Sequence, residues 1–141
     1  MNLRLILAVC AATLALAGCT SAPEPAPSTQ QLLADGAKVY GSNCANCHMA
    51  DGSGISGRDP GMVNDAVVTG DPTILIRVTL QGSDAVLPAD RPKFSETMRG
   101  YPQLNDEQIA AVLTYCRHTF GNGAAQIDPA QVQAVRAQAG L

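Results

Sequence analysis

The sequence predicts an all-α fold of about four helices in one small domain. Apolar residues recur at helical spacing in several segments, capping sequences stand at the starts of these segments, and no stretch shows the apolar–polar alternation of a strand. The chain has 141 residues, of which 46% are apolar. A domain of this size buries only a modest share of its surface, so it often needs a metal, a disulfide or a cofactor.

Four segments carry the signals of a helix start. They begin at Ser28 or Thr29, at Asp71-Pro72, at the Asn105–Gln108 sequence NDEQ, and at the Asp128–Gln131 sequence DPAQ. Ser, Asp and Asn caps bind the free N–H groups of a first turn, and a Gln three residues later completes a capping box. The first three helices are expected to end at residue 43, at Gly82 and near Gly121. Residues 49–70 and 83–104 are rich in Gly, Pro, Asp and Ser, and we predict loops there.

The N-terminal residues have the features of a targeting segment. Arg4 supplies positive charge, residues 5–16 form an apolar run that is short for a bilayer span, and the sequence LAGC follows at 16–19. LAGC resembles the lipobox of bacterial lipoproteins, which implies cleavage after residue 18 and a lipid on Cys19. The alternative is an ordinary secretory signal in which Cys19 is incidental.

These features predict four regions in the chain. Residues 1–18 are the signal peptide, 19–31 the lipidated Cys and a Pro/Ala-rich linker, 32–121 the folded domain, and 122–141 an extension with a short helix. Alternating prolines favour an extended linker that cannot form a core and would hold the domain away from the membrane. The net charge is -3 and the sequence has no basic stripe, which argues against nucleic-acid binding.

The cysteines of the folded part carry the strongest chemical signal. Cys10 would leave with the signal peptide, so Cys44, Cys47 and Cys116 remain, and the sequence CANCH places His48 directly after the second of these. A structural zinc site needs four ligands, and a thioredoxin-like dithiol belongs beside a βαβ unit. C-x-x-C-H is the attachment signature of c-type haem, in which the two thiols bind the porphyrin edge and the His binds iron. We therefore favour haem over the zinc and dithiol alternatives.

Residues 32 to about 121 also resemble the small monohaem cytochromes c of the His/Met type. Gly36, Tyr40 and Cys44 keep the spacing that these proteins show before the first haem Cys. In that family the C-terminal helix crosses the N-terminal helix at the glycine, and Val112 and Tyr115 fit the crossing. The resemblance implies a cytochrome c-like fold wrapped around one covalently bound haem c.

The resemblance also implies roles for residues beyond the attachment motif. Pro60 stands twelve residues after His48, where the family has a Pro whose carbonyl accepts the imidazole N–H. Met62 and Tyr101 occupy positions that pack on the haem. Cys116 is expected to be a small buried residue, with an intermolecular disulfide as the alternative.

The sixth iron ligand has four candidates: Met49, Met62, Met98 and His118. Met49 follows the proximal His and cannot easily reach the opposite face of the ring, and His118 lies late in a helix. The resemblance favours Met98, in the sequence TMRGYPQLNDEQIA, although Arg99 replaces the Pro that usually follows the ligand. Four arginines, Arg58, Arg77, Arg91 and Arg99, are candidate partners for the haem propionates, with a solvated surface role favoured for each.

Together these features predict a one-electron carrier without enzymatic activity of its own. It would be exported, face the periplasm, and be held at the membrane by its lipid. Its expected partners are redox proteins, either as a free carrier or as a subunit of a respiratory dehydrogenase or oxidase. The alternative is a haem sensor or peroxidase with a labile sixth ligand.

Overall fold

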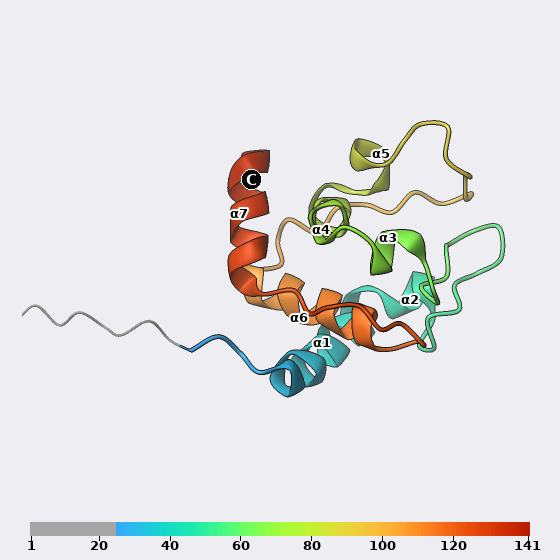
Figure 1. The fold of residues 1–141 in the computed structure, drawn as a ribbon. Coiled ribbons are helices and arrows are strands. Elements are labelled where there is room, and N and C mark those ends of the chain that lie inside the picture. The colour runs from blue at the N-terminus through green and yellow to red at the C-terminus, as the bar shows by residue number, and fades with distance from the viewer. Residues whose placement is uncertain (1–24) are drawn as a thin grey trace, which may run out of the picture.

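The computed structural model describes residues 25–141, and this part of the chain folds into helices joined by long loops (Figure 1). The helices are α1 (Thr29–Asn43), α2 (Ala45–His48), α3 (Ala66–Thr69), α4 (Pro72–Gln81), α5 (Ser83–Val86), α6 (Asp106–His118) and α7 (Pro129–Ala139). The described residues contain no named strand, only the isolated bridges Ile55–Asp59 and Gly82–Arg99. The all-α fold class predicted from the sequence is confirmed.

The four longer helices begin where their capping sequences predicted. Ser28 is the N-cap of α1, and its side chain accepts a hydrogen bond from the Gln31 N–H. Asp71 accepts from Thr73 N with Pro72 in the first turn of α4, and that helix ends at Gly82 as expected. In α6, Asn105 and Gln108 form the predicted capping box, although the helix ends at His118, a few residues before Gly121.

Three one-turn helices, α2, α3 and α5, were not predicted. Each has four residues, which is too short for a helical repeat of apolar side chains to be visible in the sequence. The last two lie inside the segments expected to be loops. In α3, the Asp65 carboxylate accepts from the backbone N–H groups of Val67 and Val68, so a side-chain cap holds the single turn.

The centre of the fold is the crossing of α1 and α6, which Figure 1 shows side by side at the base of the molecule. Gly36 of α1 packs so closely on α6 that a Cβ atom there would lie 2.1 Å from the Ala111 carbonyl oxygen. The rings of Tyr40 and Tyr115 stack beside this contact, 5.4 Å apart. The crossing at Gly36 is confirmed, with Ala111 and Tyr115 as its nearest neighbours.

The C-terminal residues pack into the same core as the rest of the chain. Ile127, Val132 and Val135 are buried and belong to the apolar cluster that α1, α4 and α6 also build. Helix α7 contacts α6 and α4 (Figure 1). The extension after residue 121 therefore contributes to the domain's interior.

A buried arginine joins three segments of this core. Arg117 is 4% exposed, and its guanidinium donates to the carbonyls of Val68, Gly70 and Ala125. Burial lowers the pKa of this guanidinium. Arg117 thus ties the end of α3 to the start of the C-terminal extension.

Residues 1–24 lie outside the described part of the chain, and with them the expected signal peptide, Cys19 and most of the linker. Among residues 25–141, no helix combines the length and the apolar character needed to cross a bilayer.

Candidate functional site

A cavity of about 760 Å³ lies between the helices and the two long loops. This volume falls within the range of about 300–1,000 Å³ that is usual for cofactor sites. The cavity brings together all the residues that the sequence predicted for the haem site: Cys44, Cys47, His48, Pro60, Met62, Met98 and Tyr101.

The one-turn helix α2 presents the attachment motif to this cavity. The N–H groups of Cys47 and His48 both bond to the Cys44 carbonyl, at 3.1 and 2.9 Å, which closes the turn. The two thiols are partly buried, and His48 is 7% exposed. Burial raises the pKa of the Cys44 thiol to about 11, with a smaller contribution from the charge of Cys47, so this thiol is protonated at neutral pH.

The His48 ring is held in one tautomer by the backbone. Its Nδ1 lies 2.8 Å from the carbonyl oxygen of Pro60. A carbonyl can only accept, so Nδ1 carries the proton and Nε2 keeps its lone pair for a metal. This is the contact that the family resemblance implied for Pro60.

A tight glycine loop brings Pro60 to His48. The Gly54 N–H bonds to the His48 carbonyl and the Met62 N–H to the Gly52 carbonyl, so the chain folds back on itself. Gly54 has φ +70, and a Cβ there would lie 2.5 Å from the Gly61 nitrogen. Only glycine fits at this position, because both the backbone angle and the close approach exclude a side chain.

Met98 lines the cavity from the second long loop, which α4 supports. The Met98 carbonyl accepts from Ser83 N at 3.0 Å, and the Tyr101 N–H donates to the Thr79 carbonyl at 2.8 Å. The Tyr101 hydroxyl donates to the Asn43 carbonyl at the end of α1. Tyr101 therefore connects the loop that carries Met98 (the Met98 loop) to the helix that leads into the Cys44–His48 motif.

The other two ligand candidates do not line the cavity. Met49 is 41% exposed, and its carbonyl accepts the Tyr40 hydroxyl at 2.7 Å. His118 is exposed at the end of α6. Cys116 is buried and lines the cavity, and burial raises the pKa of its thiol, which suits the expected apolar role.

Asn122 supports the site, although the sequence analysis did not single it out. It is 7% exposed, donates to the carbonyls of Met62 and Cys116, and accepts from Asn64 N. Its partner Met62 is 60 residues away in the chain, so neither periodicity nor local spacing points to it. A polar residue directly after Gly121, where α6 was expected to end, is the only local signal.

Three of the four candidate propionate partners line the cavity. They are Arg58, Arg91 and Arg99, whereas Arg77 bonds to Gln81 on the surface of α4. No group of three or more His, Cys, Asp or Glu side chains in residues 25–141 is placed to hold a metal ion among them. The cavity also holds the His48 imidazole and the Met98 thioether, and these two groups are common axial ligands of haem iron.

Comparison with known proteins identifies the family. The family model for cytochrome c matches residues 33–120, which is more than half of the chain. The chain belongs to the cytochrome c family.

Relatives of this cytochrome c fall into two groups. Cytochrome c-552 of Thermus thermophilus is 38% identical over 93 residues, which cover 63% of this chain and 70% of the relative. The cytochrome c subunit of a quinone alcohol dehydrogenase from Gluconobacter oxydans is 37% identical over 91 residues, covering 63% of this chain and 19% of the relative. The gluconate 2-dehydrogenase cytochrome c subunit of Pantoea cypripedii is 39% identical over 92 residues. The chain spans about a fifth of the length of these dehydrogenase subunits.

The cavity fits the cofactor that this family carries. Two thiols, an imidazole with a free Nε2 and a thioether line one mainly apolar space. The cytochrome c domain of this chain binds one haem c covalently and serves electron transfer. Haem iron supplies the one-electron chemistry, while the chain supplies attachment, ligands and an apolar enclosure.

Proposed function

We propose that this cytochrome is a membrane-tethered electron carrier whose haem iron is bound by His48 and Met98, with Cys44 and Cys47 as the covalent attachment points. The main support for this proposal is that these four side chains, from two separate segments of the chain, line one cavity. Pro60 would orient His48, and Met62 and Tyr101 would pack against the porphyrin.

Two protein ligands favour electron transfer over the sensor or peroxidase alternative. Small-molecule chemistry needs an open or labile position at the metal, whereas Met98 would fill that position from a loop anchored to α4 and α5. A thioether ligand also raises the reduction potential relative to a second imidazole, which suits a carrier that accepts electrons from a dehydrogenase.

The proposed location rests on the N-terminal sequence. The segment before LAGC has the length and charge of a bacterial export signal, and a lipid on Cys19 would hold the domain at the membrane, on the periplasmic side. The Pro-rich linker would let the haem domain turn toward a partner.

The proposed partners are membrane dehydrogenases or oxidases. The relatives named as cytochrome c subunits of alcohol and gluconate dehydrogenases support a subunit role, and the short cytochrome c-552 supports a free carrier. Identifying the proteins that co-purify from detergent-solubilised membranes would separate the two.

The ligand assignment is tested by comparing Met98→Ala with Met62→Leu in the holoprotein. We expect Met98→Ala to abolish the sulfur-to-iron charge-transfer band of the ferric spectrum and to open the iron to added imidazole. Met62→Leu, a matched change in the same cavity, should retain the band because Met62 only packs on the ring. An unchanged spectrum in Met98→Ala would disprove Met98 as the ligand.

A further inference from the structure

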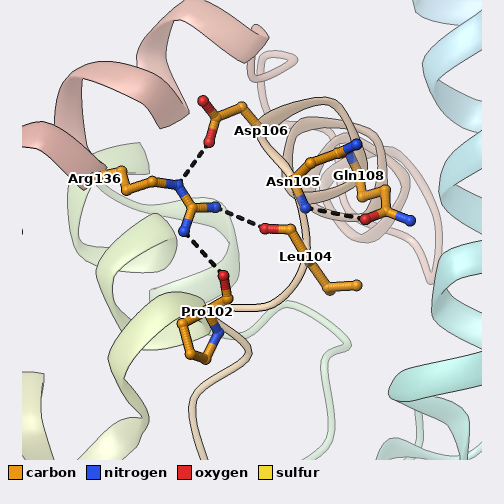
Figure 2. Close-up of polar contacts among 6 residues, drawn as sticks. All are labelled: Pro102, Leu104, Asn105, Asp106, Gln108 and Arg136. Atoms are coloured by element: carbon orange, nitrogen blue, oxygen red, sulfur yellow. Dashed lines mark hydrogen bonds and ion pairs between the residues drawn. The ribbon is translucent and has the colours of Figure 1, made fainter. Parts of the chain in front are cut away.

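Arg136 of α7 makes three directed contacts with the segment that follows the Met98 loop (Figure 2). Its Nε donates to the Asp106 carboxylate at 2.8 Å, Nη1 to the Pro102 carbonyl at 3.1 Å and Nη2 to the Leu104 carbonyl at 2.7 Å. One planar guanidinium thus binds two backbone oxygens and one side-chain oxygen.

The two carbonyls belong to a turn whose ends reach the haem cavity. The Leu104 N–H bonds to the Tyr101 carbonyl at 3.2 Å, and the side chains of both residues line the cavity. Asn105 follows directly as the N-cap of α6, where its N–H bonds to Gln108 (Figure 2). Arg136 therefore holds the junction between the Met98 loop and α6.

Two of the three contacts of Arg136, to Asp106 and Leu104, are partly buried and rest on a fixed support. The side chains of Arg136 and Asp106 are only 18% and 23% exposed, so water screens their charges less than at an open surface. Val132, one turn earlier, and the adjacent Val135 anchor α7 in the core. Arginine presents its donors in a rigid fork, which a lysine cannot reproduce.

The backbone around Met98 is held by α4 and α5, through the bonds of Met98 to Ser83 and of Tyr101 to Thr79. Arg99 and Gly100 follow the methionine, and neither limits the backbone as a proline would. Arg136 is the side chain from the C-terminal extension that adds restraint beyond Tyr101, at the Pro102 and Leu104 carbonyls.

We propose that Arg136 is a positioning residue for the sixth iron ligand: by clamping the Tyr101–Leu104 turn to α7, it limits the excursions of the Met98 loop away from the iron. The proposal rests on the proposed function of Met98. It gives the C-terminal extension a defined task in ligand retention.

Imidazole binding to the ferric holoprotein measures these excursions. Imidazole binds only where Met98 has left the iron, so its apparent affinity rises with the population of that state. We expect roughly tenfold tighter imidazole binding in Arg136→Met, and a smaller increase in Arg136→Lys, which keeps the charge but not the fork. Amide hydrogen exchange at Tyr101 and Leu104 should accelerate by about the same factor.

Leu32→Ala is the control for general destabilisation. Leu32 is buried in α1 and does not line the haem cavity, so this change should weaken the fold while leaving imidazole affinity within about twofold of the wild type. Equal imidazole affinity in Arg136→Met and the wild type, or a gain no larger than in Leu32→Ala, would overturn the proposal. Asp106→Ala removes only one of the three contacts, so a smaller gain in imidazole affinity is expected there, and it serves if the other variants fold poorly.

Met98→Ala in the same series separates the two hypotheses. If it binds imidazole much more tightly while Arg136→Met does not, the positioning role is wrong and the ligand assignment stands. If Met98→Ala does not change imidazole binding, the ligand assignment itself fails, and with it the role of Arg136.

Discussion

Gly36 shows how a single hydrogen atom in place of a side chain sets the distance between two helices. In Gly36→Ala the new methyl group would meet the Ala111 carbonyl and the Tyr115 Cβ, at 2.1 and 2.7 Å. Both neighbours belong to the buried crossing and cannot move without separating α1 from α6. We expect the free energy of unfolding to fall by about 1–3 kcal/mol, measured by chemical denaturation of the holoprotein.

Gly41→Ala is the matched control on the same helix. A Cβ at Gly41 would meet nothing within 4 Å, so this change should raise stability by about 0.5–1 kcal/mol through helix propensity alone. A similar effect of the two substitutions would contradict the role assigned to Gly36.

At the scale of single residues, the sequence predicted those residues whose partners are close in the chain or whose positions match the spacing of the family. His48, Pro60 and Gly36 were found in this way, and their contacts agree with the expectations. Asn122 and Arg136 were not found, because their partners lie 60 and about 30 residues away. A hydrogen bond between distant segments leaves no periodic signal, and only the folded chain shows it.

At the scale of elements, we expect the one-turn helix α5 to be held in part by an ion pair. Its first-turn residue Asp84 bonds to Arg91, which lies in the loop leading toward Met98. This hydrogen bond is the main reason why the pKa of Asp84 lies below its usual range. Because the folded pKa is the lower one, the contact stabilises the fold above the ordinary Asp pKa of about 4 and is lost as the pH falls through the lowered value.

Arg91→Gln tests this contact directly. We expect the NMR titration midpoint of the Asp84 carboxyl to rise toward the ordinary value when the guanidinium is removed. The part of the acid dependence of stability that comes from Asp84 should decrease at the same time. Identical midpoints in the two proteins would show that Arg91 does not hold α5.

Element boundaries were predictable wherever a cap and an apolar repeat coincide, as at Asp71-Pro72 and Asn105. They were not predictable for α2, α3 and α5, because four residues complete barely one turn. The stability of such turns comes from side-chain caps and tertiary contacts. The periodicity of apolar residues in the sequence does not reveal these contacts.

For the whole molecule, the size of the cavity makes the cofactor part of the core. The cavity of about 760 Å³ is lined mainly by apolar surface, and a cofactor that fills it removes this surface from water. Residues from both long loops, such as Met62 and Met98, line this space and depend on a partner inside it.

The double variant Cys44→Ser, Cys47→Ser, which cannot attach haem covalently, should therefore lose its cooperative thermal transition once haem is withheld. Circular dichroism should show reduced helix content, and near-ultraviolet signals of the tyrosines should weaken. Cys116→Ala is the control, since its thiol has no role in attachment. A cooperative transition near that of the holoprotein would show that the polypeptide core alone supports the fold.

The contact between Gly36 and Ala111 also has a consequence for the order of assembly. The two residues are about 75 positions apart, so α1 cannot dock until almost the whole domain has been synthesised. Cys44 and Cys47 directly follow α1 and belong to the early part of the chain. We therefore expect the thiols to be most accessible for attachment while the chain is still open, and α6 to close the structure over a haem that is already bound.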